Sequence, residues 1–232
     1  MFTRSLKDYA VILLDMNNTF MFGGDRFSTS ENYYATYREF GGHTLDRFQL
    51  DHAINACYCG MARAYENPSR IDNFLSVREG LQTYANIAEP DLHDLELVFA
   101  HHECGTVAAP FAEWLIQASQ THRLGLVSNI WAKKPLWLKE FDRAGIGEIW
   151  ATKVFSSDSR SIKPSKRLFN EALSHFDVPL SKIVFVGDNM QADVIPANAI
   201  GLDTVHICDI GQIVSSPATI SVASLLYLMP AR

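Results

Sequence analysis

The fold is decided by the stretch YAVILLDMNNTF, which runs from Tyr9 to Phe20. Its apolar part ends at Leu14 and does not alternate with polar residues, which is typical of a strand buried on both faces in the middle of a parallel sheet. The run stops at one carboxylate, Asp15, and then turns through two asparagines and a threonine. Because open α/β sheets bind their ligands at the carboxyl ends of the strands, we expect chemistry at Asp15.

Length and charge limit the classes of protein to which the chain can belong. At 232 residues it is long enough for one large α/β domain, or for a core with a smaller inserted domain. A net charge of −6 gives no general attraction to nucleic acid or to anionic lipid. No apolar run approaches the ~20 residues that span a bilayer, and the polar N-terminus is unlike a signal peptide. We therefore expect a cytoplasmic protein without a nucleic-acid or membrane partner, whose oligomeric state the sequence leaves unknown.

The four cysteines are poorly placed for a zinc site. Cys57 and Cys59 are two residues apart in a helix-like window, so they point to different faces of the helix. No second group of cysteines or histidines in the sequence has the spacing needed to complete a zinc site with them. The sequence predicts buried, reduced thiols at these positions and at Cys104 and Cys208.

Helical spacing replaces the strand pattern between residues 25 and 108. Gly23 and Gly24 precede this region and are a candidate hinge. Breaks at glycine, proline and asparagine separate four expected helices, at residues 31–40, 45–65, 73–87 and 92–101. We predict a helical insertion at residues 25–108 in a core formed by residues 1–24 and 109–232.

Strands and helices alternate in the rest of the chain. Strands are expected at residues 124–129, 149–156, 183–188, 204–208 and 219–222, and helices at 111–121, 133–145, 166–176 and 193–199. This alternation implies an α/β fold with a parallel sheet and right-handed crossovers.

Polar side chains follow several of these strands, at what should be one edge of the sheet. Two or three carboxylates form an oxygen-rich site that suits Mg²⁺. A hydroxyl, an amide and an ammonium nearby suit the oxygens of a phosphoryl group. The residues concerned are Asp15, Ser128, Asn129, Lys163, Asp188 and Asp193.

In these motifs the chain resembles the haloacid dehalogenase (HAD) superfamily of hydrolases. The superfamily's first motif, Asp-x-Asp-x-Thr, corresponds to Asp15-Met16-Asn17-Asn18-Thr19, with an asparagine in place of the usual second aspartate. The second, a Ser or Thr that ends a strand, corresponds to Ser128-Asn129. The third, a lysine commonly followed by proline, corresponds to Lys163-Pro164. The fourth, Gly-Asp with another Asp five residues on, corresponds to Gly187-Asp188 and Asp193.

The resemblance implies a Rossmann-like core, a helical cap and a role for each motif residue. Asp15 would be the nucleophile that forms an aspartyl-phosphate and, with Asp188, Asp193 and the backbone carbonyl of Asn17, would bind Mg²⁺. Thr19, Ser128, Asn129 and Lys163 would hold the phosphoryl group, and Lys163 would also offset the charge of Asp15. The residues 25–108 would close over the site as the cap.

Asn17 departs from the pattern of the superfamily's phosphatases. Their aspartate at this position protonates the leaving oxygen and later activates water, whereas an amide performs neither task. We expect the loss to matter most for alkyl phosphates and least for acyl or aryl phosphates, whose leaving groups are stable anions.

Three functions remain open at this stage. The first is a Mg²⁺-dependent phosphatase acting on a small phosphorylated metabolite, weakened or restricted to good leaving groups by Asn17. The second is a catalytically weak relative that binds a phosphorylated ligand or a partner. The third is a 2-haloacid dehalogenase, although that branch carries an aromatic residue at the position of Asn17 and needs no metal. The phosphonate-cleaving branch uses a cap lysine, and residues 25–108 contain none. Cap arginines could bind an anionic substrate, but solvated helix faces explain most of them.

Overall fold

A six-stranded parallel sheet forms the centre of the computed structural model, which describes residues 5–209 and 216–228. Its strand order is β3-β2-β1-β4-β5-β6, with every neighbouring pair parallel. The α/β fold with a parallel sheet is thus confirmed. The strands are β1 (Val11–Leu14), β2 (Arg123–Ser128), β3 (Trp150–Phe155), β4 (Ile183–Gly187), β5 (Asp203–Ile207) and β6 (Ile220–Val222).

Strand β1 is buried on both faces, as its unbroken apolar run predicts. Ile12 and Leu14 belong to one hydrophobic cluster and Val11 and Leu13 to the other, and all four side chains are fully buried. The two clusters lie on opposite faces of the sheet because successive side chains of a strand point to opposite sides. Burial of both faces fixes β1 in the centre of the sheet.

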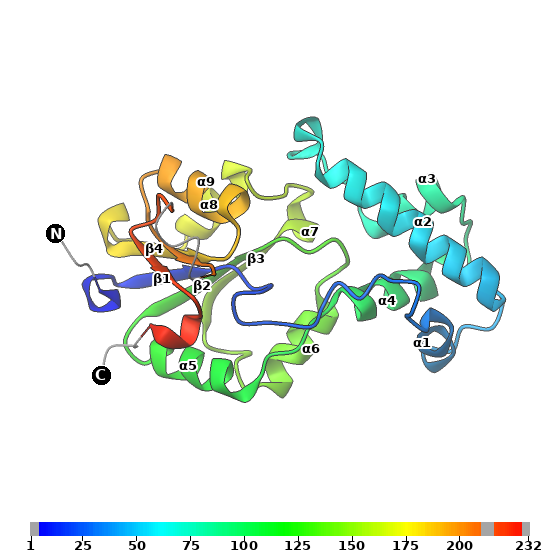
Figure 1. Cartoon of the computed structure of the whole chain (residues 1–232), viewed down its shortest axis with the longest axis horizontal. Helices are drawn as coiled ribbons and strands as arrows, with labels where there is room; N and C mark the ends of the chain where they lie inside the picture. Colours follow the sequence, from blue (N-terminus) through cyan, green and yellow to red (C-terminus); the bar gives the residue numbers. More distant parts are fainter. Residues whose placement is uncertain (1–4, 210–215, 229–232) are drawn as a thin grey trace.

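Helices cover both faces of the sheet (Figure 1). The first cluster packs β1 against α5 and α6, for example through Leu115 and Phe141, while the second packs it against α8 through Phe169. The helices of the core are α5 (Ala109–Ser119), α6 (Pro135–Arg143), α7 (Ser156–Ser159), α8 (Lys166–Leu173) and α9 (Ile195–Ala199), with a single π turn, η4 (Met190–Val194), before α9. Three-residue 3₁₀ turns occur at η1 (Leu6–Asp8), η2 (Pro68–Arg70), η3 (Leu180–Lys182) and η6 (Leu225–Tyr227).

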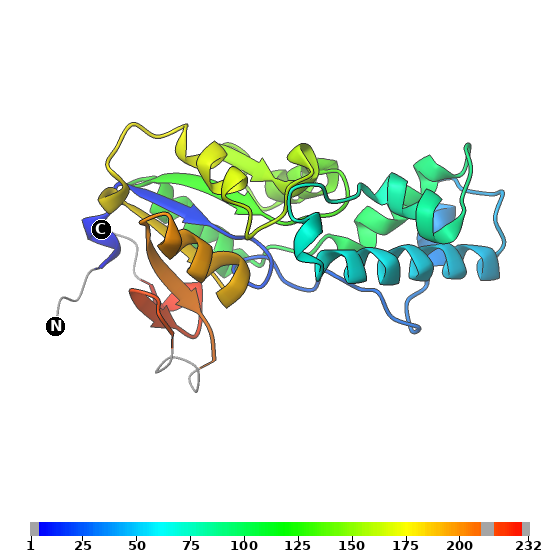
Figure 2. The ribbon, with the colours of Figure 1, turned by 90° about the horizontal axis from the view of Figure 1, so that it is seen from above.

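Four helices between β1 and α5 form a separate helical layer at one end of the molecule (Figures 1 and 2). They are α1 (Tyr33–Glu39), α2 (Arg47–Tyr65), α3 (Val77–Ala85) and α4 (Leu92–Glu103), close to the expected ranges. Helix α3 begins four residues later than expected, because Ser76 and Glu79 form a capping box at its start. The exact division at residues 24/25 and 108/109 stays a prediction.

Two chain segments connect this helical layer to the sheet and run side by side. Phe22 and Thr106 form an antiparallel bridge, and the backbone amide of Asp25 donates to the carbonyl of Glu103. Gly24 is packed so closely that an added Cβ would lie 2.4 Å from the Glu103 oxygen. Glycine is therefore required at Gly24 by the close approach of the second connecting segment.

The cysteines are unpaired, but they are not all buried. Cys57 and Cys208 are buried and Cys104 is half-buried, whereas Cys59 is exposed. The expectation of burial is wrong for Cys59. Cys57 and Cys59 are two residues apart, so their side chains point to opposite sides of α2. Separately, none of the helices in the described part of the chain has the length and apolarity needed to cross a membrane.

Candidate active site

Asp15 lies at the carboxyl edge of the sheet, directly after β1. Its backbone amide donates to the carbonyl of Val186 at 2.8 Å, which continues the pairing of β1 with β4 by one residue. Asp15 is buried, with 5% of the residue exposed. Since β2 and β4 flank β1 on opposite sides, Asp15 occupies the point where the strand order reverses, the usual ligand position of this fold.

Lys163 joins two of the expected carboxylates. It comes from the loop between α7 and α8, and its Nζ lies 2.5 Å from Asp15 Oδ1 and 2.6 Å from Asp193 Oδ1. Burial alone would lower the pKa of this ammonium, but Asp15 and Asp193 outweigh burial and raise the pKa of Lys163, so the side chain stays charged. Lys163 is 148 positions from Asp15 and 30 positions from Asp193 in the sequence, yet the three side chains form one buried ion-pair network.

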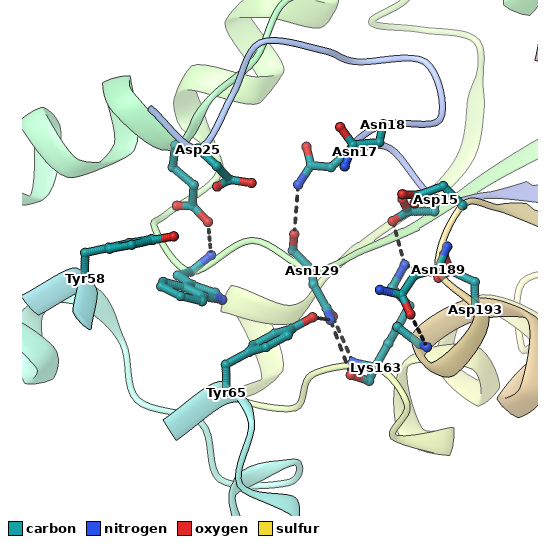
Figure 3. Close-up of a pocket in the computed structure, with 14 residues that line it drawn as sticks. Asp15, Asn17, Asn18, Asp25, Tyr58, Tyr65, Asn129, Lys163, Asn189 and Asp193 are labelled. Atoms are coloured by element: carbon teal, nitrogen blue, oxygen red, sulfur yellow. Dashed lines mark hydrogen bonds and ion pairs between the residues drawn. The ribbon is translucent and has the colours of Figure 1, made fainter. Parts of the chain in front are cut away.

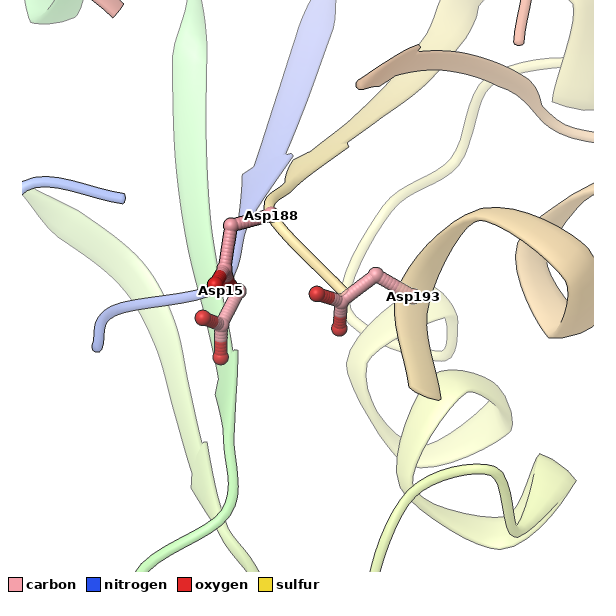
Figure 4. Close-up of side chains that lie close together, drawn as sticks. All are labelled: Asp15, Asp188 and Asp193. Atoms are coloured by element: carbon pink, nitrogen blue, oxygen red, sulfur yellow. The ribbon is translucent and has the colours of Figure 1, made fainter. Parts of the chain in front are cut away.

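Asp188 completes a cluster of three carboxylates with Asp15 and Asp193 (Figure 4). One oxygen from each lies within 4.8 Å of the other two. Burial, reinforced by the charges of Asp15 and Asp193, raises the pKa of Asp188 to about 7. Burial also raises the pKa of Asp193, against the effect of Lys163. The carboxylates therefore repel one another, and one ammonium does not neutralise them.

Ser128 and Thr19 contact Asp15 rather than the open cavity. The hydroxyl of Ser128 donates to Asp15 Oδ1 at 3.3 Å and that of Thr19 to Asp15 Oδ2 at 3.5 Å. Both side chains are buried. The structure brings them to the predicted nucleophile, where they hold its carboxylate in place.

Both the oxygen and the nitrogen of the Asn129 side-chain amide form hydrogen bonds within the protein. Its Oδ1 accepts from the backbone amide of Lys163 at 2.8 Å, and its Nδ2 donates to the Tyr65 hydroxyl at 2.7 Å and to the Lys163 carbonyl at 3.4 Å. These bonds connect the loop after β2 to the lysine loop and to the end of α2. In this arrangement the Asn129 side chain positions Lys163, and its contact with phosphate stays a prediction.

Asn17 faces the cavity from a tight loop after β1. The carbonyl of Met16 accepts the backbone amides of Thr19, Phe20 and Met21, which turns the chain back on itself. Asn17 Nδ2 donates to the carbonyl of Asn129 at 3.4 Å. The side chain that replaces the usual aspartate is therefore at the cavity.

A cavity of about 260 Å³ contains these groups and extends toward the helical layer (Figure 3). Its far wall includes five residues that the sequence did not single out: Asp25, Tyr58, Tyr65, Glu103 and Trp131. Tyr58 and Tyr65 are seven residues apart on α2, a spacing of two turns that puts them on one face and could have been noticed. Glu103 and Trp131 carry no such signal.

The donor set of the carboxylate cluster fits a divalent cation. With all three carboxylates ionised, as they would be around a cation, the cluster and its ammonium carry a net charge of −2 in a largely buried site. Asp193 uses one oxygen for Lys163 and the other for the Asn189 backbone amide at 3.0 Å, which suits an orienting role. The Asp188 carboxylate is less engaged and is a hard oxygen donor of the kind that Mg²⁺ prefers. A carboxylate beside such a cation and an ammonium can receive a phosphoryl group.

Comparison with known sequences identifies similar proteins for part of the chain. The model of the HAD-hydrolase-like family matches residues 162–208, which include Lys163, Asp188 and Asp193. A ribulose-1,5-bisphosphate 5-phosphatase from Halopiger xanaduensis is 34% identical over 68 residues, which cover 29% of this chain and 28% of that protein. The match thus spans less than a third of the curated relative.

Comparison with solved structures covers almost the whole chain. A 2-haloacid dehalogenase from Pseudomonas syringae pv. Tomato has a TM-score of 0.62 at 18% identity, over 95% of this chain and 96% of that one. A HAD phosphatase from Thermococcus onnurineus has a TM-score of 0.58 at 17% identity, over 94% of each chain. A magnesium-bound HAD-hydrolase from Bacillus subtilis has a TM-score of 0.57 at 15% identity, over 95% and 96%. At these identities the likeness concerns the fold.

The strand order, the convergence of four motifs on Asp15 and the family match over the last two motifs agree with one another. Over residues 162–208 the chain is thus similar to the HAD-hydrolase-like family, and its fold is that of solved HAD-type structures.

Proposed function

We propose that the chain is a Mg²⁺-dependent phosphatase that transfers a phosphoryl group to Asp15 and is restricted to substrates with good leaving groups. The observation that carries this proposal is the junction of Asp15, Lys163, Asp188 and Asp193 at the carboxyl edge of the sheet. The relative named as a ribulose-1,5-bisphosphate 5-phosphatase supports a phosphorylated substrate.

Each side chain has a role that follows from its contacts. Asp15 Oδ1 is held by Lys163 and Ser128, which leaves Oδ2 to attack phosphorus. Lys163 pairs with Asp15 and would place a positive charge where the phosphoryl oxygens arrive. Asp188, Asp15 and the backbone carbonyl of Asn17 would bind Mg²⁺, with Asp193 orienting Lys163 and the metal site. The bound cation would screen the charge between the carboxylates and the phosphate dianion.

The proposed reaction has two steps. In the first, the bond from phosphorus to the leaving oxygen breaks as the bond to Asp15 Oδ2 forms, and the leaving group departs with the electron pair. In the second, water attacks phosphorus, the bond to Asp15 breaks, and phosphate is released with the proton of the water. Asn17 neither protonates the leaving oxygen nor accepts that proton, so aryl and acyl phosphates are the expected substrates.

The acidic cluster distinguishes this proposal from a dehalogenase. Asp188 and Asp193 lie within reach of the nucleophile and add negative charge there. An anionic haloacid would be repelled by them, whereas a phosphate dianion that arrives with Mg²⁺ would be balanced. The carboxylates therefore favour phosphoryl transfer.

The test is phosphate release from acetyl phosphate and 4-nitrophenyl phosphate, with Mg²⁺ and after its removal by EDTA. We expect turnover with Mg²⁺ only, and a loss of about 10³-fold or more in Asp15→Asn, which keeps the shape of the side chain but removes the nucleophile. Asp158→Asn, which alters an exposed ion pair with Lys134, is the matched control and should retain full activity.

Two results would contradict the proposal. Mg²⁺ binding and phosphate binding by calorimetry, without release of phosphate from either substrate, would identify a binding protein instead. Halide release from a 2-haloacid after EDTA treatment would identify a dehalogenase.

A further inference from the structure

The far wall of the cavity is aromatic. Tyr58 and Tyr65 project from α2, and the ring centroids of both lie close to that of Trp131, at 5.8 Å and 5.7 Å. Trp131 also contacts Phe74 at 5.7 Å and Phe99 at 6.3 Å, so it belongs to a larger aromatic cluster. Figure 3 shows Tyr58 on the side of the cavity opposite Asp15, with Tyr65 between them and below. A phosphate on Asp15 would thus place its leaving group toward these rings.

Trp131 is fixed in this wall by Glu103. The Glu103 carboxylate accepts the backbone amides of Trp131 at 2.5 Å and Ala132 at 2.8 Å. It is 4% exposed and lines the same cavity. The end of α4 therefore holds the loop after β2 in the position that presents the indole to the cavity.

Acidic groups accompany the rings on this wall. Asp25 is exposed to the cavity beside Glu103, and its carboxylate makes no hydrogen bond to another residue of the described chain. Its φ of +53° is unusual for a residue other than glycine, and its backbone amide is fixed to the Glu103 carbonyl. The backbone of Asp25 is therefore held in place at the cavity, and the neighbouring charge that acts on its carboxylate is that of Arg26.

No cationic side chain lines this wall among the residues that the structure describes. Among the described residues that line the cavity, Lys163 is the single cationic side chain, and it is occupied by Asp15 and Asp193. Arg26 follows Asp25 but donates to the backbone carbonyls of Gly23, His101 and Cys104. The other cap arginines do not line the cavity: Arg38, Arg47, Arg63, Arg70 and Arg78. A second phosphate or a carboxylate on the substrate would meet negative charge here without a counter-ion.

We propose that the leaving group of the substrate is an aromatic ring that carries a positive charge, and that the same wall excludes substrates with a second anionic group. A cation over the faces of Trp and Tyr is attracted by the ring quadrupole, and Asp25 adds a charge of opposite sign. An aromatic alcohol is also the leaving group that Asn17 permits. This inference rests on the proposed phosphatase function and names its substrate class.

The kinetic test compares three phenyl phosphates that carry trimethylammonium, methyl or carboxylate at the meta position, with acetyl phosphate as the ring-free reference. We expect kcat/KM to fall from the ammonium to the methyl to the carboxylate compound. In Asp25→Asn the ratio of ammonium to carboxylate should fall by about three- to thirtyfold. The ammonium-to-carboxylate ratio of kcat/KM is compared between the wild type and Asp25→Asn. Differences in leaving-group acidity cancel in this comparison, because both enzymes act on the same compounds. Glu66→Gln, an exposed acid next to Tyr65 that does not line the cavity, should keep the wild-type ratio.

A binding test is independent of turnover. Phenyltrimethylammonium should bind the wild type in calorimetry more tightly than benzoate, and Tyr58→Leu, which replaces the flat ring by an aliphatic chain, should weaken it by about threefold or more.

The outcomes separate the two proposals. Turnover of acetyl phosphate together with equal kcat/KM for the charged compounds, or with preference for the carboxylate, overturns the charge inference and leaves the phosphatase function intact. Binding of phenyltrimethylammonium without turnover of any phosphate supports the wall and overturns the phosphatase function. Failure of the wild type to distinguish phenyltrimethylammonium from benzoate also overturns the charge inference.

Discussion

In the proposed mechanism, Asn17 is the residue that most limits the range of substrates. It reaches the cavity from the loop after β1 and donates to the Asn129 carbonyl. An amide at this position holds its protons at neutral pH. The departure of the leaving group then depends on the stability of its own anion.

Asn17→Asp should restore acid catalysis. We expect kcat for 2-phenylethyl phosphate, an alkyl ester, to rise by about 10²-fold, and kcat for phenyl phosphate to rise far less. Asn18→Asp is the matched control, since Asn18 is the next residue and also lines the cavity. Equal gains on both substrates, measured as phosphate release, would contradict the role assigned to position 17.

Lys163 offers a second test at the scale of one residue. Lys163→Met keeps most of the side-chain volume but leaves the buried carboxylates of Asp15 and Asp193 without their cation. We expect the free energy of unfolding to fall by about 3–5 kcal/mol and phosphatase activity to be lost.

The control is Lys134→Met, which breaks the exposed pair with Asp158 and should cost at most about 1 kcal/mol. Urea denaturation measures both variants. Similar losses in the two proteins would mean that Lys163 is not the buried counter-ion described here.

At the scale of elements, Glu103 ties α4 to the loop between β2 and α6. Burial raises the pKa of Glu103 to about 8 from an ordinary value of 4.5, although the two backbone amides that it accepts oppose this rise. The folded protein therefore keeps this proton at pH values where the unfolded chain has lost it. The resulting stabilisation is complete below about pH 4.5 and is lost as the pH rises through 8.

We therefore expect the free energy of unfolding to fall by about 1 kcal/mol between pH 7 and 8.5. This window lies above the range in which His102 contributes, because burial lowers the pKa of His102 to about 4. Urea denaturation across the window is the measurement. Glu103→Gln should remove most of this slope, and Glu66→Gln should retain it; an unchanged slope in Glu103→Gln would contradict the assignment.

At the scale of the whole molecule, the cavity lies where the helical layer meets the sheet edge. Asp15, Lys163 and Asp188 come from the core, whereas Tyr58 and Tyr65 come from α2. The linking segments near Gly24 and Glu103 run side by side at this junction. The carboxylate end and the aromatic end of the cavity are thus built by different parts of the chain.

The net charge of −2 at the carboxylate cluster predicts stabilisation of the whole fold by Mg²⁺. At about 100 times the dissociation constant, binding to the folded state alone contributes about 2.7 kcal/mol, or a rise in Tm of about 5–10 °C for a chain of this size. Differential scanning calorimetry with MgCl₂, against NaCl at equal ionic strength, measures the shift. Asp188→Asn should lose most of it, and an equal shift in both salts would count against a metal site.

Local sequence patterns predicted most of the fold. The unbroken apolar run up to Leu14 requires burial on two faces, and the alternation of strands and helices then allows few arrangements other than a parallel sheet with β1 in the middle. Parallel strands end at the same edge, which is why Asp15, Ser128 and Asp188 could be expected together. Lys163 was harder to place, because a lysine in a loop carries no geometric signal apart from its motif.

The carboxylate end of the cavity could be predicted from the sequence, because it lies at strand ends whose positions follow from backbone pairing. The aromatic end could not, because it depends on how distant segments pack together. Asp25, Glu103 and Trp131 meet because two linking segments and the loop after β2 pack together, and such contacts between loops have no periodicity to reveal them. Asn129 shows the same limit, since its amide cross-links the lysine loop and α2 through bonds that depend on where three separate elements end. Backbone pairing is repetitive and can be predicted from a local pattern, whereas the packing of a cap on a core is set by side chains that are distant in the sequence.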